Sequence, residues 1–350
     1  MEKKKVVVGM SGGVDSSVSA YLLKQQGYDV TGLFMKNWPE KDPSGSCLAE
    51  KDYEDVARVA DAIGIPYYSV DFSNEYREMV FSEFLADLKK GLTPNPDVLC
   101  NQKIKFHVFW QKAQSLGAEK LATGHYCQTN ALGELLKGKD PLKDQSYFLH
   151  AVPSSVLENT LFPIGHLEKS AVRSIAQSIG LSVHEKKDST GICFIGKRDF
   201  RSFVSSYLGY RPGDIITEKG VVIGIHLGAA FYTIGQRKGL GIGGQGDAWF
   251  VIGKDIEKNH VIVGQGENHP KLFTSFVEAF PLFWVHKKPV FPGNFQAKIR
   301  YRQQEEPCYA KLTEKGTLFV TFEKPQRAAT PGQSIVLYQG AVCLGGGKIL

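Results

Sequence analysis

The chain of 350 residues contains no long hydrophobic run. Without about 18 consecutive apolar residues, no segment can cross a membrane as a helix. The first residues, Met1 to Val8, pass from charged side chains directly into a short β-type run, so we expect neither a signal peptide nor a transit segment. We therefore expect a protein of the cytoplasm or a comparable reducing compartment, with no membrane partner.

Cysteine is also scarce. The six cysteines stand at positions 47, 100, 127, 193, 308 and 343. They are too dilute for a disulfide framework, and no C-x-x-C pair of the zinc or iron–sulfur type occurs. Any cysteine that matters should therefore act as a thiol, and the sequence identifies no metal ligands.

Acidic residues are few near the C-terminus, where the last 80 residues hold 11 Lys or Arg against 5 Asp or Glu. The whole chain has a net charge of +6, so all of the excess lies after residue 270. This distribution predicts a polyanion bound by the C-terminal part, with the chemistry done elsewhere. A solubilised surface with a chance asymmetry explains the charge equally well.

The pattern of apolar residues divides the chain into three parts. Up to about residue 198, short apolar runs alternate with helical patterns, which is typical of βαβ units around a parallel sheet. From Val221 on, short β-branched and aromatic runs, among them Ala229–Ile234 and Phe295–Arg302, predict antiparallel sheets or barrels. We expect an α/β domain over residues 1–198, a small, mostly β central domain over 199–270, and a β-barrel over 271–350.

The strongest local signal is the loop Gly9-Met-Ser-Gly-Gly-Val-Asp-Ser-Ser17, between the first expected strand and the first expected helix. Its glycines let backbone N–H groups curl around an anion, its serines supply hydroxyl donors, and the helix N-terminus adds partial positive charge. The loop predicts a phosphate site, and a tight turn without a ligand is the alternative. It lacks the G-K-[ST] of a Walker loop and instead resembles the PP-loop of the ATP pyrophosphatases, whose members attack ATP at the α-phosphate and form adenylated intermediates.

A second glycine cluster, Gly239–Gly246, matches G-x-G-x-x-G in two registers. Because no helix is expected after it, a dinucleotide site is excluded. With the preceding basic stretch Tyr232–Lys238, it predicts either a loop that folds over a polyanion or a plain flexible hairpin.

Two cysteines lie in polar loops of the α/β domain. Cys100 lies in the loop Thr93–Asn101, just before a helix expected to begin near Lys103. This position, close to Lys103 and Lys105, should make its thiol easier to ionise. Asp97 could accept a proton or hold a polar ligand. Cys193 lies in a second loop of small and polar residues. Each cysteine alone could be a small buried hydrophobe, but the pair favours one thiol that carries sulfur and another that resolves it.

Eight motifs together resemble, in order and over essentially the full length, those of the tRNA-specific 2-thiouridylases. These motifs are Ser11–Ser17, Phe34–Trp38, Thr93–Asn101, Ala122–Tyr126, Lys143–Phe148, Asp188–Gly196, Tyr232–Gly244 and Arg300–Arg302. The resemblance implies a PP-loop, adenine nucleotide alpha hydrolase-like ATP-binding domain followed by a tRNA-binding barrel. Two departures are Pro39, where an acid is expected, and Gln102, where a lysine is usual and one charge near Cys100 is therefore missing.

The resemblance also implies a role for each matching position. ATP would contact Gly9, Met10, Ser11, Gly12, Gly13, Val14, Asp15, Ser16, Met35 and Gly124. The target uridine would meet Asn95, Pro96 and Asp97, with Cys100 as the nucleophile and Cys193 as the cysteine that bears the persulfide. Further tRNA contacts would come from His125, Lys143, Asp144, Gln145, Arg300, Tyr301 and Gln333.

The implied reaction converts the wobble uridine of tRNA to 2-thiouridine. The extruded base attacks the α-phosphate of Mg-ATP, pyrophosphate leaves, and Cys193 delivers sulfur that it received from a cysteine desulfurase or a sulfur-relay protein. Either Cys100 releases hydrosulfide from the persulfide, or the terminal sulfur attacks directly and a Cys100–Cys193 disulfide then closes. The alternatives are another PP-loop enzyme, such as an amide or guanidino ligase, and an RNA-binding protein with a vestigial nucleotide site.

A basic strand is expected in the C-terminal part. In the run Gln296–Arg302, a period of two places Lys298, Arg300 and Arg302 on one face, which suits a sugar–phosphate backbone. Tyr301 would point the other way, into the core or toward a base. An ordinary solvated strand face is the alternative.

Overall fold

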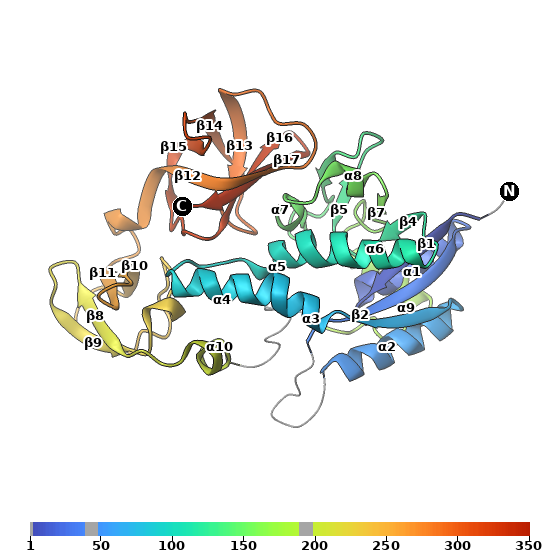
Figure 1. Cartoon of the computed structure of the whole chain (residues 1–350), viewed down its shortest axis with the longest axis horizontal. Helices are drawn as coiled ribbons and strands as arrows, with labels where there is room; N and C mark the ends of the chain where they lie inside the picture. Colours follow the sequence, from blue (N-terminus) through green and yellow to red (C-terminus); the bar gives the residue numbers. More distant parts are fainter. Residues whose placement is uncertain (1–2, 39–47, 189–198) are drawn as a thin grey trace.

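The structure is a computed structural model that describes residues 3–38, 48–188 and 199–350. The chain forms a parallel sheet covered by helices, a small middle sheet and a C-terminal barrel, which Figure 1 shows in blue to green, yellow and orange to red. Within the described residues, no helix is both long enough and apolar enough to span a bilayer.

The first sheet is parallel throughout and has the strand order β3-β2-β1-β4-β7. Its strands are β1 (Lys5–Met10), β2 (Asp29–Lys36), β3 (Tyr67–Asp71), β4 (Lys120–Ala122) and β7 (Thr160–Leu161). The central strand β1 is buried on both faces, which explains why it is an almost continuous apolar run, whereas β3 at the edge of the sheet is largely exposed. In β1, Val6 and Val8 pack on one face and Val7 belongs to the cluster on the other.

Helices cover both faces of this sheet (Figure 1). The cluster of Val6 and Val8 includes α1 (Val14–Gln25), α2 (Leu48–Ile63) and α9 (Lys169–Ser178). The cluster of Val7 includes α3 (Ser73–Tyr76), the π-helical η1 (Arg77–Phe81), α4 (Ser82–Lys89), α5 (Pro96–Leu99), the π-helical η2 (Cys100–Val108) and α6 (Phe109–Ser115). Shorter helices are α7 (Ser146–Leu149) and α8 (Ser154–Leu157), and α10 (Phe200–Leu208) leads into the middle sheet.

The helix around Cys100 begins earlier than its sequence pattern suggests. α5, η2 and α6 follow one another without a break from Pro96 to Ser115, so the expected start near Lys103 is wrong. The reason is local: the Asn95 side chain accepts a hydrogen bond from Asp97 N (3.1 Å), and Pro96 occupies the first helical position. Cys100 therefore lies inside a helical run and not before its N-terminus.

The middle sheet has the order β10-β11-β8-β9, with β8 (Gly213–Thr217), β9 (Val222–His226), β10 (Trp249–Asp255) and β11 (His260–Gln265). The strand expected over Ala229–Ile234 is wrong, because Ala229–Phe231 forms a 3-10 turn, η3. A short apolar run becomes buried in either conformation, so periodicity does not distinguish them. The element after the glycine cluster 239–246 is β10 and not a helix, which agrees with the exclusion of a dinucleotide site.

The C-terminal sheet closes into a six-stranded barrel with the order β12-β15-β14-β13-β16-β17, because β12 also pairs with β17. Its strands are β12 (Phe273–Trp284), β13 (Gly293–Lys298), β14 (Glu306–Leu312), β15 (Leu318–Arg327), β16 (Ser334–Gln339) and β17 (Val342–Ile349), preceded by the 3-10 turn η4 (Pro270–Leu272). The hairpin of β5 (Cys127–Thr129) and β6 (Leu135–Lys137) extends the barrel sheet through β17. The barrel is thus attached to the first part of the chain by strand pairing.

Candidate active site

The glycine–serine loop lies at the carboxyl edge of the parallel sheet, between β1 and α1. Ser11 N donates to Ser16 Oγ (3.1 Å), and Ser16 Oγ donates to Gly13 O (3.2 Å), so one hydroxyl ties the loop to the first turn of α1. Gly13 is the N-cap and has no side chain that could occupy the amides of that turn. These N–H groups point to where an anion can bind.

Two glycines allow the loop to be packed from both sides. Gly12 has φ +69°, and an added Cβ would lie 2.6 Å from Asp52 O. Gly124, which follows β4, would place a Cβ 2.7 Å from Ser16 N. Met10 and Val14 are buried beside them. The structure therefore brings Gly124 against the helix N-terminus, although the two segments are far apart in sequence.

Asp15, in the first turn of α1, is held by two groups that sequence reasoning did not select. Lys169 Nζ donates to both carboxylate oxygens of Asp15 (2.7 and 2.8 Å), and Tyr126 Oη donates to Oδ1 (2.8 Å). Tyr126 belongs to a recognised motif, which could have drawn attention to it. No local pattern distinguishes Lys169 from any other lysine at the start of a helix.

Asp188 is the centre of a cluster of cations. Its carboxylate forms ion pairs with Lys143 (2.6 Å), Lys169 (2.7 Å) and Arg173 (3.2 Å). Burial alone would raise the pKa of Asp188, but the bonds from Lys143 and Lys169 outweigh it and lower the pKa to about 2. Asp188 stays ionised, and Lys169 bridges it to Asp15.

Lys186 binds the phosphate loop and connects it to α2. Its Nζ donates to Gly12 O (2.9 Å), Asp52 Oδ1 (2.8 Å) and Asp55 Oδ2 (2.6 Å), which ties the loop to α2. Burial disfavours the charged form of Lys186, but the bonds to the two aspartates outweigh it, so its pKa is raised. The Gly12 carbonyl oxygen, which would otherwise repel a phosphate, is thereby occupied by a hydrogen bond from Lys186.

The expected uridine site lies close to this loop. His125 packs against Phe106 of η2 with ring centroids 5.8 Å apart, and η2 continues α5, which carries Asp97. Burial raises the pKa of Asp97, and Lys105 only partly opposes this. Burial and Lys105 together hold the pKa of His125 well below its usual value. His125 directly follows Gly124, which contacts the start of α1. The helical run that carries Asp97 therefore lies near the phosphate loop.

Cys100 is buried, with 2% of its surface exposed. Lys103, which was expected to help ionise it, forms an ion pair with Glu83. Beside the thiol, Asn101 donates from Nδ2 to Phe148 O (3.3 Å), while its Oδ1 has no hydrogen-bond partner within the described part of the chain. Cys193 lies outside the described residues.

The segment Lys143–Gln145 lies between the loop and the barrel. Gln145 exchanges two hydrogen bonds with the Tyr126 backbone, from Tyr126 N to Gln145 Oε1 and from Gln145 N to Tyr126 O (both 3.0 Å). Asp144 is buried and accepts from Ser146 Oγ (3.0 Å) and Lys298 Nζ (3.2 Å). In this conformation the Asp144 carboxylate is fully engaged within the protein.

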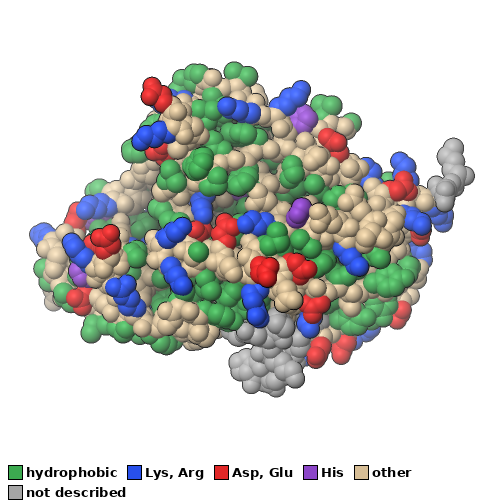
Figure 2. Space-filling view, viewed as in Figure 1, with side chains coloured by type: hydrophobic (Ala, Val, Ile, Leu, Met, Phe, Trp, Pro, Cys, Tyr) green, Lys and Arg blue, Asp and Glu red, His purple; other side chains and the backbone are tan. Residues whose placement is uncertain are grey.

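The expected basic strand face is wrong. β13 ends at Lys298, and the following residues turn, with Arg302 at φ +63°. Lys298 pairs with Asp144 in the interior, whereas Arg300 is exposed and donates to Arg327 O (3.3 Å). Alternation requires extended backbone, and that ends where the turn begins. In the view of Figure 2, basic side chains are spread over the middle unit and the centre of the molecule and are not confined to the barrel.

The remaining expected tRNA contacts lie where the barrel meets the first part of the chain. The Tyr301 ring packs against the ring of Phe148, with centroids 4.4 Å apart, next to Lys143–Gln145. Gln333 Nε2 donates to Thr93 O (2.7 Å), just before the Asn95–Asp97 segment. The structure thus brings these residues to the two segments that the sequence predicted to contact tRNA and uridine.

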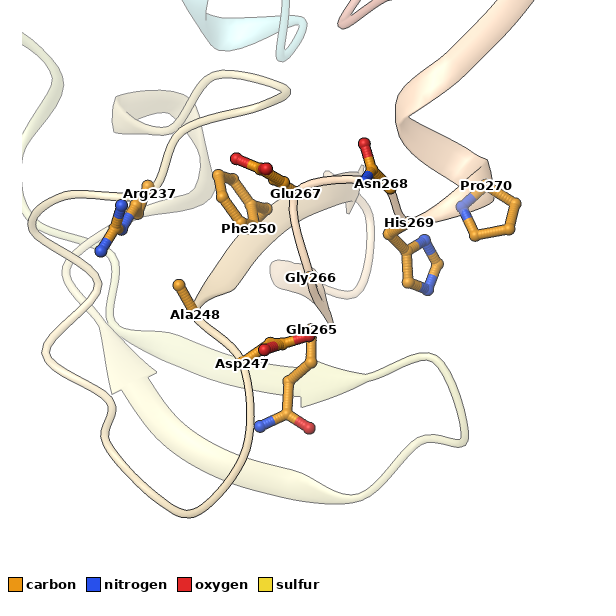
Figure 3. A pocket seen from close by; sticks show the side chains of 10 residues that line it. All are labelled: Arg237, Asp247, Ala248, Phe250, Gln265, Gly266, Glu267, Asn268, His269 and Pro270. Atoms are coloured by element: carbon orange, nitrogen blue, oxygen red, sulfur yellow. The ribbon is translucent and has the colours of Figure 1, made fainter.

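Two cavities were compared with this site. The larger, of about 560 Å³, lies in the middle unit (Figure 3), at the other end of the molecule from β1 and α1. Its lining includes the acids Asp247 and Glu267 against one cation, Arg237, so it does not suit a polyphosphate. The smaller, of about 310 Å³, lies at the carboxyl ends of β2 and β3, and its lining includes Phe34, Lys36 and the acids Glu50 and Asp71. Met35, an expected ATP contact, packs on the other face of the sheet from Phe34.

The fold and the loop together define a class. A parallel sheet whose first strand leads through a glycine–serine loop into an uncapped helix N-terminus, followed by two β units, is a nucleotide-binding protein of the PP-loop type. Family models agree part by part: "tRNA methyl transferase HUP domain" matches residues 4–197, "tRNA methyl transferase PRC-barrel domain" residues 201–265, and "Aminomethyltransferase beta-barrel domain" residues 277–349.

Comparison with individual proteins is more specific. The tRNA-specific 2-thiouridylase MnmA of Protochlamydia amoebophila is 58% identical over 351 residues, 99% of this chain and 93% of that protein. The proteins of the same name from Halalkalibacterium halodurans and Pseudomonas putida are 53% and 54% identical, each over 99% of this chain and 95% of the relative. The chain belongs to the family of tRNA-specific 2-thiouridylases, as its motifs predicted.

Proposed function

We propose that this protein is a tRNA-uridine 2-sulfurtransferase, which adenylates the wobble uridine of tRNA with ATP and then replaces the activated oxygen with sulfur from a cysteine persulfide. The observation that carries the proposal is the contact of Gly124 with the start of α1. The next residue, His125, packs against Phe106 of η2 with ring centroids 5.8 Å apart, and η2 continues the helical run that begins with the expected uridine residues Pro96 and Asp97.

In the first step, the 2-oxygen of uridine attacks the α-phosphate of ATP, and pyrophosphate leaves. The open amides of α1 and the Ser11 and Ser16 hydroxyls bind the phosphates. The cavity at the carboxyl ends of β2 and β3 has the size for a base or ribose. Mg²⁺ would arrive with the phosphates, which supply most of its oxygen ligands, and Asp15 is the carboxylate placed to add one.

Asp97 is placed to handle the proton of the uridine. Its raised pKa suits a carboxyl group that accepts a proton from the ring as the oxygen attacks and returns it later. Asn95 and Pro96, which start the helix, fix the position of Asp97 in its first turn.

In the second step, sulfur replaces the adenylated oxygen and AMP leaves. Cys193 carries the persulfide, loaded by a cysteine desulfurase or a sulfur-relay protein. In one route, Cys100 attacks the inner sulfur, Cys193 Sγ, and releases hydrosulfide, which attacks the activated carbon. In the other route, the outer sulfur of the persulfide attacks that carbon. Cys100 then attacks Cys193 Sγ, which frees the thiolated uridine and forms a Cys100–Cys193 disulfide. Both routes end with two oxidised cysteines, which an external thiol must reduce.

We assign the nucleotide chemistry to residues 1–198, a linking role to residues 199–270 and tRNA binding to residues 271–350. The pairing of β6 with β17 and the bond from Gln333 to Thr93 support this arrangement, because they hold the barrel beside the site. A substrate of this kind places the enzyme in the cytoplasm, where tRNA and ATP are available.

The decisive experiment follows ATP turnover. Purified protein is mixed with labelled ATP and an unmodified tRNA transcript, and AMP and pyrophosphate are measured with and without the tRNA. We expect turnover that requires tRNA and falls at least tenfold in Asp15→Ala and Ser16→Ala, but not in Ser115→Ala, a matched change on the exposed side of α6. Turnover that ignores tRNA would instead indicate a ligase that adenylates a small molecule.

The sulfur step is tested separately. Labelled sulfane sulfur should load wild-type protein and Cys100→Ser but not Cys193→Ser, and neither variant should form 2-thiouridine. Mass spectrometry of the loaded protein identifies the cysteine. A persulfide on Cys127, Cys308 or Cys343 would overturn the assignment.

A further inference from the structure

Two chains of hydrogen bonds join the expected tRNA-contact segment Lys143–Gln145 to Asp15 of the phosphate loop. In the first, Lys143 binds Asp188 (2.6 Å), Asp188 binds Lys169 (2.7 Å), and Lys169 binds Asp15 (2.7 Å). In the second, Gln145 binds the Tyr126 backbone, and the Tyr126 hydroxyl binds Asp15. No residue of the first chain adjoins another in sequence.

The Lys169 ammonium is shared between two carboxylates. It is 11% exposed, its backbone N–H donates to Asp140 Oδ2 (3.0 Å), and it faces the Tyr126 ring at 5.8 Å. The helix that carries it, α9, packs directly on α1. Lys169 therefore has little freedom other than a small shift toward Asp15 or toward Asp188.

We propose that Lys169 is a positioning residue that couples tRNA binding to the ATP step by moving between Asp15 and Asp188. This inference rests on the proposed function and adds to it a route between the two substrates. A tRNA phosphate that binds Lys143 takes one cation from Asp188. Asp188 then attracts Lys169 more strongly, and Asp15 Oδ2 becomes available to the cation that accompanies ATP, while Oδ1 keeps its hydrogen bond from Tyr126.

Competition for a single charge gives the coupling its direction. In the free protein, Lys143 and Arg173 both offset the negative charge of Asp188, so Lys169 can remain paired with Asp15. With Lys143 engaged by tRNA, only Arg173 and Lys169 neutralise Asp188. By linkage, ATP must strengthen tRNA binding by the same factor.

The two partners of the first ion pair make opposite predictions. Lys143→Met removes the cation as tRNA would, so affinity for a nonhydrolysable ATP analogue with Mg²⁺ should rise in the absence of tRNA, toward the wild-type value with tRNA. Asp188→Asn removes the competitor, so the tRNA-free affinity should stay at or below that of wild type. A merely structural ion pair would make both variants behave alike.

Calorimetric titration of the analogue, with and without an unmodified tRNA transcript, measures the coupling factor. In wild type we expect tRNA to tighten the analogue by roughly five- to 100-fold. Saturating tRNA should change the affinity less than twofold in Lys169→Met and Asp188→Asn, while Lys169→Arg, which can still bind two carboxylates, should retain part of the effect. Lys120→Met is the matched control, since Lys120 is also pinned by two hydrogen bonds but lies at the other end of the sheet.

Each outcome has one meaning. If wild type shows tRNA-dependent tightening and all the cluster variants keep it, the coupling route is wrong and the proposed function stands. If wild-type ATP turnover ignores tRNA, the proposed function fails first. Should Asp188→Asn not fold, the sign of the Lys143→Met effect still decides, because a fall in tRNA-free affinity contradicts the competition.

Discussion

Gly124→Ala tests whether the phosphate loop and the uridine site form one rigid unit. The added Cβ would lie 2.7 Å from Ser16 N and 2.8 Å from the Asp15 carbonyl carbon. Both are backbone atoms at the start of α1 and cannot rotate away. Ordinary contact needs a separation of about 3.5 Å, so the two segments must part by roughly 0.8 Å.

The structure sets the size of the expected effect. Overpacking of this kind costs about 1–3 kcal/mol of unfolding free energy, and a displaced helix N-terminus should weaken ATP binding at least tenfold, since a misplacement of about 1 Å can cost 100-fold in rate. Urea unfolding and titration with an ATP analogue, both without tRNA, measure the two effects.

The control is Gly243→Ala. A Cβ at Gly243 meets no atom within 4 Å, so this variant carries the same chemical change without the collision. If Gly124→Ala matched the control in both stability and nucleotide affinity, the close approach would be soft, and the argument that it aligns the two sites would be refuted.

Three further predictions follow from single groups. Lys143 and Lys169 outweigh the cost of burial and set the pKa of Asp188 to about 2, so the ionised carboxylate stabilises the fold above its ordinary pKa near 3.8 and loses this contribution as the pH falls toward 2. Wild type should be more stable than Asp188→Asn by about 1–2 kcal/mol after allowance for partial exposure. In urea unfolding this difference should shrink between pH 3.8 and 2, and a constant difference would contradict the ion pairs. Burial raises the pKa of the Cys308 thiol to about 12, so Cys308 should resist iodoacetamide at pH 8 in the folded protein and react once it is unfolded, as peptide mapping would show; equal rates in both states would disprove its burial. Arg300→Ala should weaken tRNA binding by about 1–3 kcal/mol and flatten the salt dependence by about one phosphate, or roughly 0.7–0.9 in log K per tenfold change in salt; isotherms at several salt concentrations that matched wild type would place the tRNA elsewhere.

Local chemistry was readable from the sequence wherever neighbouring residues carry it. The loop from Gly9 to Ser17 needs glycines for its turn and small hydroxyls for its ligands, and these stand next to one another in the chain. The alternation of apolar runs and helical patterns likewise predicted the parallel sheet, because burial on both faces demands it. Short β-branched runs predicted a C-terminal barrel in the same way, and the structure shows that six strands close it.

The misreadings arose where a local signal had two meanings. The stretch Thr93–Asn101 is polar and was predicted to be a loop, although Asn95 and Pro96 within it cap and start a helix. The run to Arg302 has a strand's composition, but its extended backbone ends at Lys298, where the side chain turns inward to Asp144. In both cases, packing chose between conformations that the residues alone permit.

The sequence by itself determined the family, the class of fold and the loop that should bind phosphate, because these depend on residue types at short spacing. Only the tertiary structure decided which charges surround that loop. Lys169 lies 154 positions from Asp15 in the chain, yet their charged groups are 2.7 Å apart. Contacts of this kind leave no periodic pattern in the sequence, because they form only when α1, which carries Asp15, packs against α9, which carries Lys169.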